Sequence, residues 1–334
     1  MIAPYCVAVT GSRESGSRPV LLFVLGFGRS GTSALARVLS LCGATLPAGL
    51  LGATSDNPRG CFEPRAAIHL NESILRSHGS SGYDPTLRMQ EEGVFDERER
   101  ATWIAKIRAY LASLPDAPLV VIKEPKITML TDLWFEAAGL AGFDVAAIIA
   151  IRHPDEVVGS LERRSSQQRY VRNSAALTSA WWLKFTLLAE RNTRGIPRVF
   201  LDYTNLLEDW RREMKRAAVA LSVDLDARDE PVIDEFLTSD LHHHRRIGPV
   251  PEPFGTDWLS SVYESMSAAA CDEPWDPTKL DHVFEQYRSA ERGFRMVFED
   301  HGRYRNINRA MPPFLIKLVL GGLALLHRRR GTWT

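Results

Sequence analysis

The residues with the clearest chemical potential form the loop Gly26-Phe27-Gly28-Arg29-Ser30-Gly31-Thr32-Ser33, which lies between an apolar run and a helical pattern. Glycines let the backbone turn tightly and direct successive N–H groups inward. The N-terminus of the following helix adds a partial positive charge, and Arg29 adds a full one. Because three hydroxyl side chains add further donors, we predict that this loop binds a phosphate or sulfate group.

Short apolar runs could supply the strands that position this loop. They are Val20–Leu25, Leu119–Ile122, Val145–Ile151 and Arg198–Tyr203. Runs of this length with a turn or a helix start after them are typical of buried strands in a parallel sheet. Helical patterns lie between the runs, so the sequence predicts a P-loop-like, three-layer α/β/α fold with a central parallel sheet.

Several helices have recognisable ends. The helix after the first loop is predicted to stop at Gly43, a second to begin at Pro154, and a third to be capped by Asn205. Two more helices are expected over Trp258–Ala270 and Thr278–Asp300. A helical C-terminal extension would follow them.

Bulk composition narrows the function class. The 334 residues contain 41 Lys and Arg against 41 Asp and Glu, so net charge gives no indication of a nucleic-acid partner. The four cysteines form no CxxC pair, which favours a reduced, cytoplasmic protein. The first 18 residues lack the pattern of a secretory signal, and we interpret them as a disordered lead-in to a domain over residues 19–310.

The segment 311–334 contains a run, Phe314–Leu326, that is apolar except for Lys317 and is followed by His327 and three arginines. A bilayer-spanning helix needs about 20 apolar residues, so this run is too short to span comfortably. Two interpretations remain open. Residues 314–330 could pack on the core, or they could make a peripheral contact with the inner, anionic face of a membrane.

A second pattern, IIAIRHPDEVVGSL over Ile148–Leu161, ends a strand with Arg152 and places Ser160 eight residues later in a helix. In the first loop, Gly31 is followed by Thr32 and not by the lysine of a nucleotide-kinase P-loop. Together the two patterns resemble those of PAPS-dependent sulfotransferases, in the branch of bacterial and carbohydrate enzymes. PAPS is 3′-phosphoadenosine 5′-phosphosulfate, and its desulfated product is PAP.

The resemblance implies roles for individual residues. The loop, including Gly28, Arg29 and the residues from Ser30 to Ser33, would hold the 5′-phosphosulfate. Arg152 and Ser160 would bind the 3′-phosphate, because a planar guanidinium can donate two charge-assisted hydrogen bonds to phosphate oxygens. Tyr203 would contact adenine, although a core tyrosine is the competing interpretation.

The basic segment His242–Arg246 resembles the part of the family that closes over the donor phosphates, which makes Arg245 a candidate. A solvated loop is the alternative for this segment. No metal is expected here, because consecutive histidines cannot all face one ion and no carboxylate pattern accompanies them.

Transfer itself needs cations near the leaving group and a base for the acceptor proton. Arg29 and Lys123 are the candidate cations. The stretch Lys123-Glu124-Pro125-Lys126 lacks the histidine of animal cytosolic sulfotransferases and resembles bacterial relatives, which often use a glutamate after the first helix. The resemblance therefore favours Glu63 as the base, with Glu124 as runner-up.

The sequence does not identify the acceptor. Asn57 and Arg59 could orient it, and a carbohydrate, glycolipid or other small-alcohol hydroxyl is the first expectation. A P-loop small-molecule kinase and a non-catalytic PAP or nucleotide binder are the alternative functions. The sequence does not predict an oligomeric state.

Overall fold

The computed structural model describes residues 18–54, 57–167, 173–237, 249–310 and 313–329. It has two compact units, Met1–Val283 and Phe284–Thr334, with the boundary inside one long helix. The domain boundary that the sequence analysis placed at residue 310 stays a prediction.

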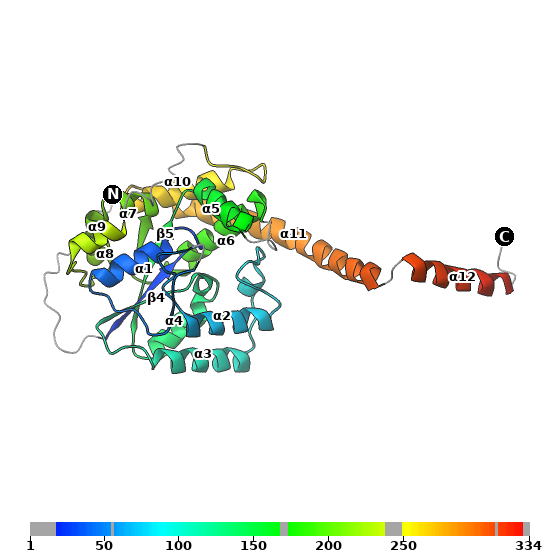
Figure 1. The fold of residues 1–334 in the computed structure, drawn as a ribbon, viewed down its shortest axis with the longest axis horizontal. Coiled ribbons are helices and arrows are strands. Elements are labelled where there is room, and N and C mark those ends of the chain that lie inside the picture. The colour runs from blue at the N-terminus through cyan, green and yellow to red at the C-terminus, as the bar shows by residue number, and fades with distance from the viewer. Residues whose placement is uncertain (1–17, 55–56, 168–172, 238–248, 311–312, 330–334) are drawn as a thin grey trace. The chain divides into compact units, whose positions relative to one another are not determined.

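A parallel sheet of four strands, in the order β4-β1-β5-β6, forms the centre of the first unit (Figure 1). The strands are β1 Val20–Leu25, β4 Leu119–Lys123, β5 Asp144–Ile151 and β6 Arg198–Asp202. All residues of β1 and β4 are buried, as continuous apolar runs require. The four predicted strands are confirmed, each to within a residue at its ends.

The strand register brings the loops that carry the candidate site residues to one edge of the sheet. Leu21 of β1 pairs with Val120 of β4 and with Val145 of β5, and all neighbouring strands run in parallel. The carboxyl ends of the strands therefore lie at one edge of the sheet. Ligands of open α/β sheets bind at this edge.

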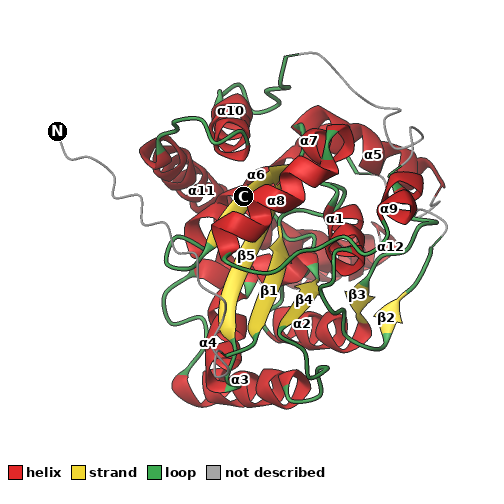
Figure 2. Ribbon diagram, turned by 90° about the vertical axis from the view of Figure 1, so that its left-hand side faces the viewer, coloured by secondary structure: helices red, strands yellow, loops and turns green. Residues whose placement is uncertain are grey.

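Helices cover both faces of the sheet (Figure 2), which confirms the predicted α/β/α layers. On one face, Leu22 and Val24 pack in a core shared with α1 Thr32–Leu41, α7 Tyr203–Glu208 and α8 Trp210–Leu221. On the other face, the ring of Phe23 contacts Trp134 of α4 Thr131–Leu140. Helix α6, Ala175–Asn192, also packs against β5.

The remaining elements of this unit are short or peripheral. They are β2 Leu50–Leu51, β3 Glu63–Pro64, α2 Arg65–Ser77, α3 Glu97–Leu111, α5 Pro154–Gln167, α9 Glu230–Phe236, α10 Trp258–Ala270 and two 3₁₀ helices, Arg88–Gln90 and Pro125–Met129. Strands β2 and β3 pair in antiparallel fashion.

The predicted boundaries of three helices are confirmed and one predicted helix cap is wrong. Gly43 follows α1 at φ 98°, α5 begins at Pro154, and α10 has the predicted bounds. The predicted cap at Asn205 is wrong. Two helices occupy that stretch, because the carboxylates of Asp202 and Asp209 accept from the backbone N–H groups of Thr204 and Arg212 and start a helix each.

The second unit contains most of α11, Pro277–Ala310, and all of α12, Pro313–Arg329. Helix α11 is longer than the predicted Thr278–Asp300. Within the described part of the chain, no helix is both long enough and apolar enough to cross a membrane.

Candidate active site

The loop between β1 and α1 depends on glycine at two places. Gly26 has φ 119°, and a Cβ there would lie 2.7 Å from the carbonyl oxygen of Ala150. Gly31 has φ 84°, and a Cβ there would lie 2.2 Å from the ring of Tyr203. The hydroxyl of Thr128 also accepts from the N–H of Gly26 at 3.1 Å. The loop is therefore fixed against neighbouring backbone and side chains.

The N-terminus of α1 is arranged to receive an anion. Its N-cap, Gly31, supplies no side-chain hydrogen bond, and the first turn contains no acidic residue. A Cβ at Gly28 would meet no atom within 4 Å, and Gly28 lines a cavity. The predicted cradle thus faces open space, with positive helix potential directed into it.

Four residues predicted to bind the donor contact one another. Arg29 Nε donates to Ser160 Oγ at 2.9 Å, and Arg152 Nη1 donates to the carbonyl oxygen of Arg29 at 3.1 Å. The Arg152 guanidinium lies 4.7 Å from the centroid of the Tyr203 ring. Glu156 Oε2 accepts from Arg152 Nε at 2.7 Å and so fixes the plane of that guanidinium.

Tyr203 exposes only 7% of its surface, and its ring packs against Gly31. Burial raises the pKa of its hydroxyl. Its contact with adenine stays a prediction, and so does the role of Arg245, which lies outside the described residues with the rest of His242–Arg246.

The two predicted catalytic groups Lys123 and Glu63 form an ion pair. Lys123 ends β4, exposes 3% of its side chain, and places Nζ 2.6 Å from Glu63 Oε1. The same ammonium donates to Ser33 Oγ and to the carbonyl oxygen of Cys61, each at 3.0 Å. All three N–H bonds of Lys123 therefore have an acceptor.

The segment before Glu63 folds back onto α1. The Asn57 amide donates to the carbonyl oxygen of Gly60 at 2.8 Å and to Ser33 Oγ at 3.3 Å. Phe62 adopts φ 56°, a conformation uncommon outside glycine, and Glu63 then pairs with β2. This turn directs the Glu63 carboxylate towards Lys123.

Arg59 points elsewhere, because its guanidinium contacts both the carbonyl oxygen and the ring of Phe236 in α9. Whether Asn57 or Arg59 orients an acceptor stays a prediction.

Glu124, the runner-up base, is fully buried. Burial raises its pKa, although the ammonium of Lys126, 2.7 Å away, opposes that shift. The Asn71 amide donates to its second oxygen, and Trp134 Nε1 donates to Asn71 at 2.8 Å. Both Glu124 oxygens are thus engaged by protein groups.

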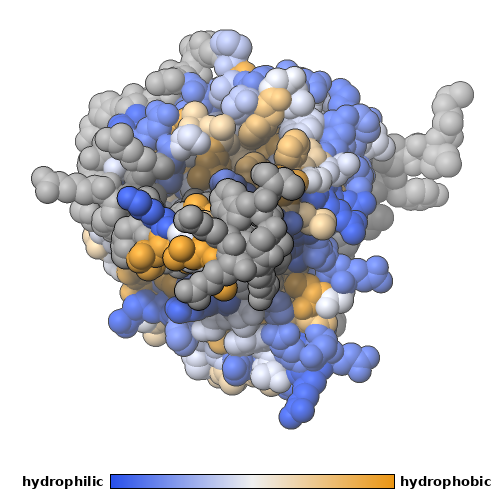
Figure 3. Space-filling view, turned by 90° about the vertical axis from the view of Figure 1, so that its right-hand side faces the viewer, coloured by the Kyte–Doolittle hydropathy of each residue, from blue (hydrophilic) through white to orange (hydrophobic). Residues whose placement is uncertain are grey.

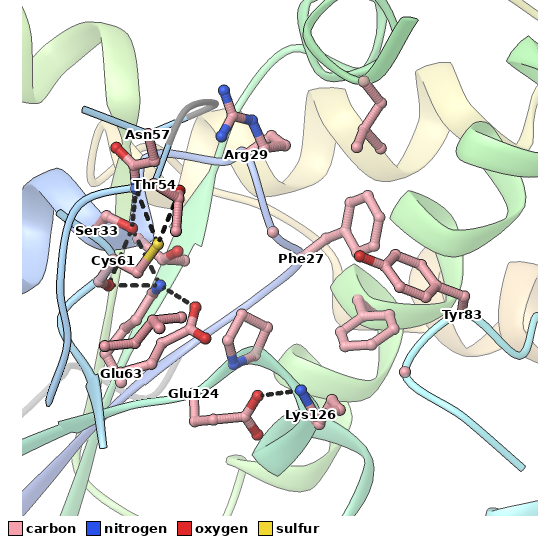
Figure 4. Close-up of a pocket in the computed structure, with 18 of the residues that line it drawn as sticks. Phe27, Arg29, Ser33, Thr54, Asn57, Cys61, Glu63, Tyr83, Glu124 and Lys126 are labelled. Carbon is pink, nitrogen blue, oxygen red and sulfur yellow. Dashed lines mark hydrogen bonds and ion pairs between the residues drawn. The ribbon is translucent and has the colours of Figure 1, made fainter. Parts of the chain in front are cut away.

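A cavity of about 260 Å³ joins these groups (Figure 4). Arg29, Ser33, Glu63 and Lys123 line it, and so do Phe27, Tyr83 and Phe185. Figure 4 shows Phe27 and Tyr83 across the cavity from Ser33, Cys61 and Glu63. The cavity therefore has a charged side and an aromatic side, here called the aromatic wall and defined by Phe27, Tyr83 and Phe185.

Helix α6 holds the aromatic wall in place. Trp181 Nε1 donates to the carbonyl oxygen of Tyr83 at 2.5 Å, and the two rings lie 5.1 Å apart. The buried Lys184 ammonium donates to the carbonyl oxygens of Asp84 and Thr86, at 2.9 and 2.6 Å. The sequence analysis placed Phe27 in the predicted anion-binding loop without assigning it a role, and it singled out neither Tyr83 nor Phe185, although the adjacent Trp181 and Trp182 were a signal that α6 is buried.

Among the residues that the structure describes, no group of three or more His, Cys, Asp and Glu side chains could hold a metal ion.

Comparisons with known proteins gave weak similarities only. No family model matches the chain, and no curated protein does. Among solved structures, 22 chains match.

Three of these structures illustrate the range. The sulfotransferase domain of the Synechococcus PCC 7002 olefin synthase has 18% identity and a TM-score of 0.45, over 77% of this chain and 98% of that one. The sulfotransferase domain of the curacin biosynthetic pathway has 15% identity and a TM-score of 0.42, over 78% and 100%. Retinol dehydratase in a complex with retinol and PAP has 14% identity and a TM-score of 0.34, over 80% and 82%. Values this low do not assign the chain to a family.

Proposed function

We propose that this protein is a sulfotransferase that transfers a sulfuryl group from PAPS to an acceptor hydroxyl and releases PAP. The observation that carries the proposal is the contact between Arg29 of the anion-binding loop and Ser160, beside Arg152. Two patterns that are 131 residues apart in the sequence thereby form one cationic site. PAPS carries a 5′-phosphosulfate and a 3′-phosphate on one ribose, so the residues that bind these two anionic groups must lie close together.

The described residues fit this donor. The cap-free N-terminus of α1 would bind the 5′-phosphosulfate through backbone N–H groups, as helix termini bind anions elsewhere. Arg152, held by Glu156, and Ser160 would bind the 3′-phosphate. Tyr203 and Arg245 would complete the donor site.

In the transfer step, the acceptor oxygen forms a bond to sulfur while the bond from sulfur to the bridging phosphate oxygen breaks. Lys123 and Arg29 would stabilise the charge that develops on the bridging oxygen, as fixed cations do in phosphoryl transfer. Glu63 would accept the proton that leaves the acceptor hydroxyl.

The buried contacts favour Glu63 over Glu124 as the base. Both carboxylates belong to residues that line the cavity, but Glu63 keeps 17% of its side chain exposed, whereas Glu124 has no exposed surface and is held by Asn71 and Lys126. A base must come within hydrogen-bond reach of the proton that it takes. Glu63 meets this condition with less rearrangement.

The aromatic wall bears on the acceptor. A cavity of about 260 Å³ holds only the reacting end of a molecule, and here that end would lie against Phe27, Tyr83 and Phe185. Such a wall suits a hydroxyl on a ring or on another apolar body. The faces of sugar rings and of small cyclic alcohols both meet this description, so carbohydrates, glycolipids and other small alcohols are the proposed acceptors.

Thermal denaturation with PAP, ATP or ADP tests the donor. A ligand that binds only the folded state raises the unfolding temperature, so PAP should stabilise the protein most. Preferential stabilisation by ATP would overturn the proposal in favour of a kinase. Stabilisation by PAP without transfer of labelled sulfate to any hydroxyl in a panel of sugars and cyclic alcohols would indicate a binding protein.

The Glu63→Gln variant tests the base. It should abolish transfer and leave the affinity for PAP nearly unchanged, because the substitution removes a proton acceptor and keeps the shape of the side chain. A fully active Glu63→Gln variant would rule out Glu63, and Glu124→Gln would then be the next variant to measure.

A further inference from the structure

The second unit exposes an unusual amount of apolar surface. Of the 15 large hydrophobic residues found exposed in the described chain, 11 lie in α11 or α12. In α12, Leu318, Leu320 and Leu325 expose 67, 60 and 63% of their surface. Figure 3 shows exposed hydrophobic side chains on the face of the molecule that it presents. An apolar surface of this kind marks an interaction site.

The apolar residues of α12 share a broad face. At 3.6 residues per turn, the exposed residues from Leu315 to Leu326 occupy a little over half of the helix circumference. Lys317, Gly321 and Ala324 lie on the opposite stripe of the helix. The face is wider than the narrow seam by which two helices pair in a coiled coil, and it suits a broad apolar medium.

The charge of the C-terminal residues indicates what covers the apolar face of α12. Residues 301–334 contain seven Lys and Arg, at positions 303, 305, 309, 317, 328, 329 and 330, and no Asp or Glu. Since the whole chain has 41 of each sign, the first 300 residues hold 34 basic and 41 acidic residues. The apolar helix therefore lies in the strongly basic part of an otherwise acidic chain. A second copy would bring a like charge, whereas an anionic lipid surface is complementary.

Length excludes a simple crossing of the bilayer. The 17 residues of α12 extend about 25 Å at 1.5 Å per residue, less than the roughly 30 Å of hydrocarbon in a bilayer. We propose that α12 lies in the plane of an anionic membrane surface, with its broad apolar face among the acyl chains and its flanking arginines at the headgroups. This inference does not depend on the proposed sulfuryl transfer.

Sedimentation of the full chain with lipid vesicles tests the proposal. The protein should bind vesicles of phosphatidylcholine and phosphatidylglycerol, bind pure phosphatidylcholine vesicles far less, and dissociate as salt is raised. Reversing Arg328, Arg329 and Arg330 to Glu should weaken binding to the anionic vesicles about 100-fold or more, since each basic residue near such a surface contributes about a factor of five.

Matched controls separate this site from bulk charge and bulk hydrophobicity. Arg98, Lys215 and Arg228 are exposed in the first unit, and reversing these three to Glu changes the net charge equally. That variant should keep its binding within a few fold. Leu318→Asn with Leu325→Asn should lose binding, whereas Val219→Asn, at an exposed position of α8, should not.

Three results would overturn the proposal. One is failure of the wild-type chain to bind anionic vesicles. Another is equal loss in the two charge-reversed variants, which would mean nonspecific attraction. The third is a dimer in sedimentation velocity that the two leucine substitutions dissociate, because a second copy would then cover the face. Unchanged thermal unfolding of each variant shows that its first unit is folded.

Discussion

Replacing Lys123 by Met probes the centre of the candidate active site. The substitution keeps the length and apolar stem of the side chain and removes an ammonium that donates to Glu63, Ser33 and Cys61. Glu63 then loses the cation 2.6 Å from its carboxylate. Both stability and transfer should respond, for separate reasons.

The structure sets the size of the effect on stability. Breaking a buried ion pair by removing one partner costs about 3–5 kcal/mol, because the other charge remains buried. Lys123 is 3% exposed, but Glu63 is 17% exposed and borders the cavity, so water can replace part of the lost contact. We therefore expect Lys123→Met to lower the free energy of unfolding by about 2–3 kcal/mol. Glu63→Gln keeps an acceptor oxygen and should cost about 1–2 kcal/mol.

A double-mutant cycle in urea gives the coupling between the two residues. The double variant should be more stable than the sum of the single losses predicts, by about 1–2 kcal/mol, because it leaves no unpaired charge. The exposed pair Arg100 and Glu136 provides a control, with side chains 37 and 44% exposed, and its coupling should be below about 1 kcal/mol. Additive losses at Lys123 and Glu63, to within about 0.5 kcal/mol, would refute the ion pair. In the transfer assay, Lys123→Met should lower kcat by about 100-fold or more, as loss of a fixed charge-stabilising donor does.

Arg152→Ala should weaken PAP binding by about 2–5 kcal/mol, measured by titration calorimetry, and an unchanged affinity would contradict its phosphate role. Tyr83→Ala should raise the KM for a ring-bearing acceptor several-fold, whereas Tyr83→Phe, which keeps the aromatic ring, should raise it less. Gly31→Ala should lower the free energy of unfolding by about 2 kcal/mol or more, because its Cβ would lie 2.2 Å from the Tyr203 ring at φ 84°; wild-type thermal unfolding would disprove that packing. Burial raises the pKa of Asp202 from 3.8 to about 6, so the folded state holds more protons than the unfolded state in that interval. Stability from this group therefore declines as pH rises from about 4 to about 6, and Asp202→Asn should flatten that part of the curve of unfolding temperature against pH.

The strands and the glycine-rich loop between β1 and α1 could be predicted because their signals are local. Val20–Leu25 is a continuous apolar run, and a strand buried on both faces requires one. Two glycines of the following loop have conformations that other residues adopt with strain, φ 119° at Gly26 and φ 84° at Gly31. Neither signal depends on a distant part of the chain.

The helix caps and the aromatic wall could not be predicted from the sequence, for different reasons. Asn205, Asp202 and Asp209 are all good capping residues, and only the end of β6 and the turn between the helices decide which of them act as caps. Helix α6 is buried along most of its length, Lys184 included, so its sequence has no polar face from which a helical period could be identified. Tyr83 is brought to the cavity by that helix, 98 residues later in the sequence.

Ser33 connects the two halves of the candidate site. It belongs to the first turn of α1, whose N–H groups face the predicted phosphosulfate position. Its hydroxyl accepts from Lys123 and Asn57 and donates to the carbonyl oxygen of Cys61, two residues before Glu63. The helix end that would bind the donor therefore also positions the cation and the segment that carries the base. In the proposed mechanism, this one turn of helix would set the donor and Glu63 relative to each other, as in-line displacement demands.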